Sequence, residues 1–312
     1  MSYQINSLFP RLEENDLPSK HIDGSNWHNQ PIDIITIGDS FSNGMASGKN
    51  AYYQDFLATS LQINVLNIQN IDASFGYIDT IRYLHKNKWL AKVQPKAILI
   101  QCVVRESLDH VSIQKNAIFL TPRKLNHYLF KNNFIKEFPR PMVINTANYK
   151  APYYYIKYNH SIHAKKEIYK FPLVKNYFTA KDSSHLLIYH DDINKINSFT
   201  EKNIVKLNSE LNTLADELKQ DHIILLFMPS VDKYDLYHDY IQGNNNYPKN
   251  PFFPLLRKQQ KSYILVDTKA ILRPMIEKNI QDVYYADDTH WGFKASEQLA
   301  NDIIFTFLKD KK

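Results

Sequence analysis

The sequence predicts an α/β protein in which helices cover a mostly parallel sheet in three layers, α/β/α. Short apolar segments alternate with segments of helical spacing, which is typical of strands joined by crossover helices. Of the 312 residues, 44% are hydrophobic, so the chain can bury a sizeable core. Because no run of about 18 apolar residues occurs and no charged-then-apolar leader precedes residue 30, we expect neither a membrane-spanning helix nor a secretion signal.

The first third of the chain carries this alternation most clearly. Apolar runs rich in Ile predict buried strands, and the segments between them have apolar residues at helical spacing. The expected elements are residues 32–37 (strand), 52–61 (helix), 63–68 (strand), 77–87 (helix) and 97–104 (strand). Residues 1–30 show no periodicity, and we expect an irregular lead-in there.

The alternation resumes after residue 200. The expected elements are residues 204–218 (helix), 222–228 (strand), 263–266 (strand) and 293–308 (helix). Between the two regular parts lies a stretch of mixed periodicity. The simplest organisation is one domain over residues 1–312, with a core at about 32–110 and 203–308 and an insertion at about 115–200.

The insertion has a composition of its own. Between residues 121 and 181 the chain has 12 Lys or Arg, two acidic residues and 13 Tyr or Phe, a balance of +10 against +6 for the whole chain. Basic aromatic stretches bind single-stranded nucleic acid or anionic surfaces, but more often they are solvated faces with their aromatic rings packed inward. The composition alone leaves these alternatives open.

The segment Gly38-Asp39-Ser40 follows the first expected strand and precedes a helix. Sites in open parallel sheets lie outside the carboxyl ends of strands, so a serine on this turn points into such a crevice. Its hydroxyl becomes a good nucleophile only when a neighbouring base takes the proton. Since all three residues also favour turns, the segment alone supports catalysis and a plain turn about equally.

A second group of polar residues, Asp287, Asp288 and His290, precedes the last expected helix. A histidine can act as the base for a serine, and a carboxylate can fix its tautomer and orientation. Asp and Thr here are also suited to capping a helix. Together with Ser40 at the other end of the chain, however, they favour a triad of Ser40, His290 and one of the two Asp.

With these two blocks the sequence resembles the SGNH or GDSL esterase superfamily. The resemblance implies the SGNH hydrolase-like fold, with Ser40 as nucleophile. The superfamily's usual Asp-x-x-His register gives Asp287 and His290, and we slightly prefer Asp287 for that reason. The resemblance also implies an oxyanion hole from the N–H groups of Ser40 and Gly76. The superfamily's third donor is an Asn after the third strand; Arg105 stands near that place here.

A narrower resemblance is to the alginate O-acetyltransferase branch of the superfamily. Residues 288–291 match its DTHW segment, in which the acid is Asp288, and residues 229–237 resemble its P…K…Y segment. The resemblance implies Lys233 and Trp291 as substrate-binding residues, although Trp291 is equally suited to packing under the last helix. In that branch the Gly-Asp-Ser block follows DTHW, whereas here it comes first, as in ordinary SGNH esterases.

Other chemistries fit less well. The single Cys102 excludes a disulfide framework and a cysteine-rich zinc site. Gly48-Lys49 lacks the spacing of a phosphate loop, and no G-x-G-x-x-G follows a strand. His160 and His163 have no third clustered ligand, so we expect no metal.

The sequence therefore predicts a serine-dependent O-acyltransferase or esterase that acts on a carbohydrate. We prefer O-acetyl transfer to a polysaccharide or glycan because of the DTHW segment. An O-acetyl esterase is the alternative within the same chemistry, and a non-catalytic glycan-binding protein is the alternative of another class. We expect no cofactor other than an acyl donor, such as an acetyl ester or acetyl-CoA. The expected partners are a carbohydrate acceptor and an anionic membrane surface, not nucleic acid. The expected compartment is the cytoplasm, or the periplasm or membrane if an export leader or anchor precedes the chain.

Overall fold

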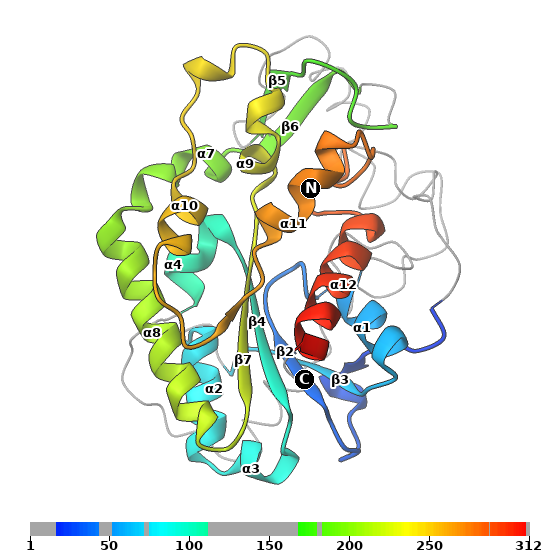
Figure 1. Cartoon of the computed structure of the whole chain (residues 1–312), viewed down its shortest axis with the longest axis vertical. Helices are drawn as coiled ribbons and strands as arrows, with labels where there is room; N and C mark the ends of the chain where they lie inside the picture. Colours follow the sequence, from blue (N-terminus) through cyan, green and yellow to red (C-terminus); the bar gives the residue numbers. More distant parts are fainter. Residues whose placement is uncertain are drawn as a thin grey trace, which may run out of the picture.

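Parallel strands form the central sheet of the protein (Figure 1). The computed structural model describes residues 17–43, 52–71, 75–111, 168–179, 183–286 and 288–309. In this part of the chain the strand order is β1-β3-β2-β4-β7-β8, and all neighbouring pairs are parallel. The strands are β1 (Ile22–Asp23), β2 (Ile34–Ile37), β3 (Val65–Ile68), β4 (Ala97–Val103), β7 (Ile224–Ser230) and β8 (Ile264–Leu265).

The middle of this sheet is covered on both faces. Every residue of β2, β3 and β4 is buried, which is why these strands appear in the sequence as continuous apolar runs. In the register, Ile35 of β2 lies between Leu66 of β3 and Ile98 of β4. The chain leaves β2 for β3 on one side and reaches β4 on the other, so the sheet has its topological switch point between β2 and β4.

Helices pack on the two faces of the sheet and complete the predicted three layers (Figure 1). On one face lie α1 (Tyr53–Leu61), α11 (Thr268–Glu277) and α12 (Phe293–Lys309). On the other face lie α2 (Tyr77–Lys86), α3 (Trp89–Val93), α8 (Glu201–Lys219) and α10 (Phe252–Arg257). Within the described residues, none of these helices has the length and apolar content that crossing a bilayer requires.

Helix α8 shows how the sequence pattern produces this packing. Thr200 caps it by accepting a hydrogen bond from the N–H of Asn203, and one apolar stripe then faces the core. The buried residues of that stripe include Ile204, Leu207, Leu211, Leu214 and Leu218. The helix predicted for residues 204–218 is therefore confirmed, one turn longer because the cap lies upstream of the apolar stripe.

The described part of the predicted insertion begins with a two-stranded antiparallel sheet, β5 (Ile168–Pro172) and β6 (His185–Tyr189), followed by the short helix α7 (Asp191–Asn194). Phe171, Leu186 and Ile188 are buried in the same hydrophobic core as the main sheet. Residues 112–167 lie outside the described residues. What is described of the insertion thus packs onto the α/β core and does not form a separate core.

Three features differ from the sequence prediction. Residues 22–23 pair with β3, although the lead-in shows no periodicity. Short helices that the apolar pattern did not indicate include α4 (Ser107–His110), α9 (Lys233–Tyr237) and α11. Strand β7 continues through Pro229, where a strand end was expected. Proline has no N–H to donate to a neighbouring strand, so it fits where one side of the strand is unpaired. Pro229 pairs with β4 on one side only, because β8 pairs only with Leu226 and Phe227.

Candidate active site

The turn that carries Ser40 follows β2 directly and lies at the switch point of the sheet. Gly38 allows this turn because no side chain fits there. A Cβ on Gly38 would approach the Gln101 carbonyl oxygen to 2.9 Å and the Ser42 hydroxyl to 2.6 Å. The glycine therefore lets the chain after β2 press against β4, which brings Ser40 to the carboxyl end of the sheet.

Asp39 fastens this turn to β4. Its carboxylate accepts hydrogen bonds from the N–H of Val103 (2.6 Å), the N–H of Phe41 (3.0 Å) and the side chain of Gln101 (2.8 Å). Its own N–H donates to Gln101 Oε1 (3.1 Å). Burial raises the pKa of Asp39 above its ordinary value, although the three donors oppose that shift. Asp39 is thus part of the support for the turn.

Ser40, His290 and Asp288 form a continuous chain of short contacts. His290 Nε2 lies 2.7 Å from Ser40 Oγ, and His290 Nδ1 lies 2.6 Å from Asp288 Oδ1. The same carboxylate oxygen accepts from the His290 N–H at 3.1 Å. His290 and Asp288 are buried, whereas Ser40 is partly exposed. This order of groups matches a nucleophile, a base and the acid that orients the base.

Of the two candidate acids, Asp288 is the one whose carboxylate meets Nδ1. The preference for Asp287 came from the Asp-x-x-His register, and it is corrected here. Only one residue separates Asp288 from His290, whereas two separate Asp287 from it. Across this shorter spacing, Asp288 Oδ1 contacts both the backbone N–H and the ring of His290. Asp287 lies outside the described residues.

Aromatic packing fixes the imidazole of His290. The Phe41 ring lies 4.6 Å from the His290 ring and 4.5 Å from the Trp291 ring, and Tyr284 packs edge-on to Trp291. Trp291 is only 2% exposed, so no ring face is open to a sugar. Its expected substrate-binding role is wrong: Trp291 is part of the wall behind Phe41 and His290.

Lys233 is also not placed for substrate binding. Its side chain is completely buried at the start of α9, and its Nζ donates to the carbonyl oxygens of Tyr285 (2.6 Å), Ala286 (2.9 Å) and Asp288 (3.1 Å). The substrate-binding role expected from the P…K…Y resemblance is therefore corrected. Lys233 contacts the loop that carries the acid and the base.

The two backbone N–H groups expected in the oxyanion hole, those of Gly76 and Ser40, differ in whether a hydrogen-bond acceptor already engages them. The Gly76 N–H donates to the Asp79 carboxylate at 3.1 Å in a capping box at the start of α2, so in this structure it is engaged elsewhere. Among the described residues, no hydrogen bond takes up the Ser40 N–H. In this structure the Gly76 N–H is therefore taken up by Asp79, and the oxyanion roles expected for Gly76 and Ser40 stay predictions.

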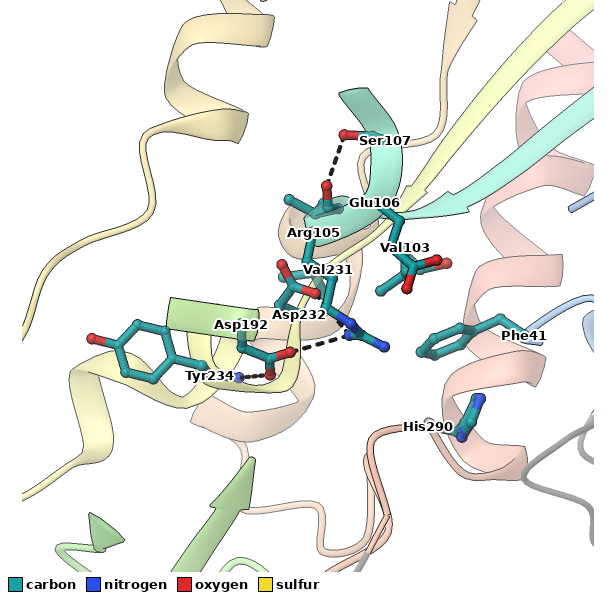
Figure 2. Close-up of polar contacts among 12 residues, drawn as sticks. Phe41, Val103, Arg105, Glu106, Ser107, Asp192, Val231, Asp232, Tyr234 and His290 are labelled. Atoms are coloured by element: carbon teal, nitrogen blue, oxygen red, sulfur yellow. Dashed lines mark hydrogen bonds and ion pairs between the residues drawn. The ribbon is translucent and has the colours of Figure 1, made fainter. Parts of the chain in front are cut away.

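Arg105 lies just after β4, on the side of Phe41 and His290 (Figure 2). Figure 2 shows its guanidinium between the carboxylate of Asp192 and the ring of Phe41, with His290 beyond. Nη1 donates to Asp192 (3.1 Å) and to Asp232 (3.0 Å), and Nε has no partner among the described residues. The guanidinium carbon also lies 5.5 Å from the centre of the Tyr189 ring. Arg105 is thus held at the edge of the site by residues of β6, α7 and the segment after β7.

The electrostatics of this cluster are those of one cation between two buried acids. Burial raises the pKa of Asp192, and it raises the pKa of Asp232 further because Asp192 lies beside it. Burial lowers the pKa of Arg105, but the two carboxylates more than offset that effect, so it stays charged.

Sequence reasoning missed three residues that support the site. Gln101 is a buried polar residue inside the apolar run of β4, and it connects Asp39 to Ser230. A polar residue within an apolar strand indicates a buried hydrogen-bond partner, so the sequence did contain a sign of the role of Gln101. Asp192 and Asp232 had none, because each becomes important only through Arg105, 87 and 127 residues away.

Two features of the described part of the chain bear on a metal or cofactor: its ligating side chains and its cavities. No group of three or more His, Cys, Asp or Glu side chains is placed to hold a metal ion there. A cavity of about 460 Å³ lies beside Arg105, between α4 and the start of α8. Polar groups in its wall already bond to each other, as Lys195 does to Asp109 and Asn203 to Ser198. We therefore assign no ligand to it.

No family model and no curated protein matches the sequence. Among solved structures, the chain is similar to one described as a lipolytic protein of the G-D-S-L family from Desulfitobacterium hafniense DCB-2, at 9% identity and a TM-score of 0.37, over 86% of this chain and 96% of that one. It is also similar to a structure described as a GDSL-like lipase from Parabacteroides merdae ATCC 43184, at 12% identity and a TM-score of 0.37, over 92% of this chain and 96% of that one. Identity and TM-score are low in both cases.

Proposed function

We propose that this chain is an SGNH-type enzyme that breaks acyl esters with the triad Ser40, His290 and Asp288. The observation that supports this most directly is the continuous chain of contacts, 2.7 Å from Ser40 Oγ to Nε2 and 2.6 Å from Nδ1 to Asp288. Both distances are within the range that proton transfer and orientation require. The partial exposure of Ser40 gives a substrate access to the nucleophile.

The reaction follows from this geometry. Ser40 Oγ attacks the ester carbonyl carbon while His290 Nε2 takes the hydroxyl proton, and Asp288 stabilises the imidazolium through Nδ1–H. The tetrahedral intermediate collapses, and the leaving alkoxide takes the proton from Nε2 as the C–O bond breaks. The acyl group is then on Ser40. A water or sugar hydroxyl, deprotonated by His290, attacks it and restores the free serine.

Negative charge on the carbonyl oxygen needs preorganised donors. The Ser40 N–H is suited to this role because no described acceptor engages it. Arg105 is a second candidate, since its guanidinium lies toward Phe41 and His290 in Figure 2 and its Nε has no partner in the described residues. Its two acid partners fix its position, so it would donate without reorganising.

For the acceptor, we favour a carbohydrate hydroxyl over water, which makes the enzyme an O-acetyltransferase. Two features support this choice: the match of residues 288–291 to the DTHW segment, and the +10 balance of residues 121–181, which suits a polymer. Most of residues 121–181 lies outside the described residues, so polymer binding stays a prediction. A carbohydrate O-acetyl esterase is the second candidate. A non-catalytic glycan-binding protein is disfavoured because such a protein has no need of a 2.7 Å Ser–His contact.

A fluorophosphonate label and an activated acetyl ester test the core of this proposal. We expect the label to map to Ser40, and Ser40→Ala to lose turnover by about 10⁴-fold or more while remaining folded. Ser209→Ala, at an exposed serine of α8, is the matched control and should keep wild-type turnover. A folded Ser40→Ala protein with near wild-type activity would remove Ser40 from the mechanism.

Partition of the acyl group then separates transferase from esterase. The wild-type enzyme is given an acetyl donor with and without a soluble oligosaccharide, and acetylated sugar and free acetate are both quantified. A transferase forms acetylated sugar at the expense of acetate. Release of acetate alone, at a rate that does not respond to the acceptor, supports the esterase.

A further inference from the structure

We infer that Lys233 is a positioning residue that holds the loop of Asp288 and His290 in its catalytic shape. This inference rests on the function proposed above. Lys233 carries a charged ammonium group but is buried in the protein interior. The side chain has no exposed surface, and the Phe178 ring lies 4.9 Å from Nζ. Burying an ammonium group is costly unless its donors are satisfied.

Three backbone carbonyl oxygens accept hydrogen bonds from the Lys233 ammonium group. An ammonium has three N–H donors and no acceptor, and Nζ lies within hydrogen-bond distance of three backbone carbonyl oxygens. These belong to Tyr285 (2.6 Å), Ala286 (2.9 Å) and Asp288 (3.1 Å), all in the loop before His290. A buried group with this geometry cannot reach a substrate, so its charge serves the loop.

Three carbonyl groups that converge on one point fix the curvature of the loop. Asp288 is held twice as a result, through its carbonyl by Lys233 and through its carboxylate by His290. The loop is closed on its other side by the Tyr285 N–H, which donates to the His290 carbonyl at 3.1 Å. If the carbonyl groups moved, the carboxylate would move with them, and His290 would lose its orientation toward Ser40.

Lys233 itself begins α9, a short helix that also contributes Asp235. Lys269 of α11 donates to Asp235 at 2.7 Å, and its side chain is 18% exposed. Lys269 therefore connects α11 to the same helix, α9. Its contact is with Asp235 and not with the loop of Asp288 and His290. It offers a control lysine for Lys233.

The experiment compares Lys233→Met with Lys269→Met in the full chain. A displacement of about 1 Å costs roughly 10²-fold in rate, so we expect Lys233→Met to lower kcat for an activated acetyl ester by about that factor. We expect KM to change by less than about threefold, because Lys233 does not touch substrate. Lys269→Met should leave kcat and KM at wild-type values.

A second readout does not depend on activity. The short contact of His290 Nδ1 with Asp288 should give a strongly downfield proton resonance. We expect that resonance to be lost or shifted in Lys233→Met and kept in Lys269→Met. If the wild-type protein hydrolyses no ester, the proposed function fails, but the resonance still decides whether Lys233 positions the loop.

The inference is overturned if folded Lys233→Met has wild-type kcat and an unchanged resonance. If Lys233→Met does not fold, Lys233→Gln replaces it, since glutamine keeps two N–H donors. Reduced kcat and an altered resonance in folded Lys233→Gln support the inference, and wild-type values overturn it. If neither variant folds, Lys233 anchors the whole fold and not this loop, and the inference is equally wrong.

Discussion

The carboxylate of Asp288 decides the chemistry of His290. It contacts Nδ1 and also accepts from the backbone N–H of the same histidine, so one acid fixes both the ring and its attachment to the loop. The Phe41 ring fixes the imidazole from one side. These contacts leave Nε2 directed at Ser40, which is the orientation that a general base requires.

Replacing the two neighbouring acids separately tests this assignment. Asp288→Asn should lower kcat by about 10⁴-fold with an intact fold, because the amide favours the wrong imidazole tautomer. Asp287→Asn should cost far less than Asp288→Asn. Turnover of the activated ester by both purified variants is the measurement. Equal, mild losses in the two variants would show that neither acid orients His290.

At the scale of elements, the site depends on the close approach of the β2 turn to β4. Gly38 supplies the space, and Asp39 supplies hydrogen bonds to Val103 and Gln101. Gln101 extends the connection to Ser230 at the end of β7. The ends of the three neighbouring strands β2, β4 and β7 are therefore joined by hydrogen bonds next to Ser40, which restricts the position of its turn.

The substitution Gly38→Ala should disturb this junction. The new methyl group would meet the Gln101 carbonyl, so we expect a loss of about 1–3 kcal/mol in the free energy of unfolding. A shift of the turn should also lower kcat by about 10²-fold.

Gly243→Ala is the control for this effect. Gly243 lies in a distant turn at φ 69°, where alanine costs about 1–2 kcal/mol by backbone strain. Denaturant unfolding and ester turnover are measured for both variants. If Gly38→Ala kept wild-type kcat, Gly38 would matter for folding alone.

For the molecule as a whole, one buried cluster joins segments that are far apart in the sequence. Arg105 follows β4, Asp192 lies in α7 near the end of the insertion, and Asp232 precedes α9 (Figure 2). Two acids share one guanidinium, and one oxygen of Asp232 has no partner among the described residues. The described end of the insertion is thereby tied to the core by charge as well as by apolar packing.

The raised pKa of Asp232 gives this cluster a pH dependence. A raised pKa means that the folded protein keeps the proton at pH values where the unfolded chain has released it. The contribution of Asp232 to the free energy of unfolding therefore falls as the pH rises through that window. As the pH rises above the ordinary range of an aspartic acid, wild-type protein should lose more stability than Asp232→Asn.

Denaturant unfolding at several pH values checks this expectation. Asp216→Asn removes an exposed carboxylate of α8 and should give a curve parallel to that of the wild type. If Asp232→Asn also runs parallel to the wild type, the carboxyl group of Asp232 does not titrate differently in the two states.

The sequence by itself determined the layers and the turn that carries Ser40. Both depend on patterns within a few residues of each other. Apolar runs form buried strands, and an apolar stripe at helical spacing forms α8. The turn of Gly38, Asp39 and Ser40 follows directly from the end of such a run. The proposal of Ser40 and His290 as a pair came from two short polar blocks at opposite ends of the chain, taken together.

Only the tertiary structure decided the roles of the residues around them. Whether Lys233 meets a sugar or three carbonyl groups, and whether Trp291 is open or covered, depends on which segments fold over them. The choice of Asp288 depends on how the loop curves. Contacts between residues far apart in the chain, such as Ser40 with His290, leave no periodicity or spacing in the sequence, because their geometry is set by packing of the completed sheet and helices.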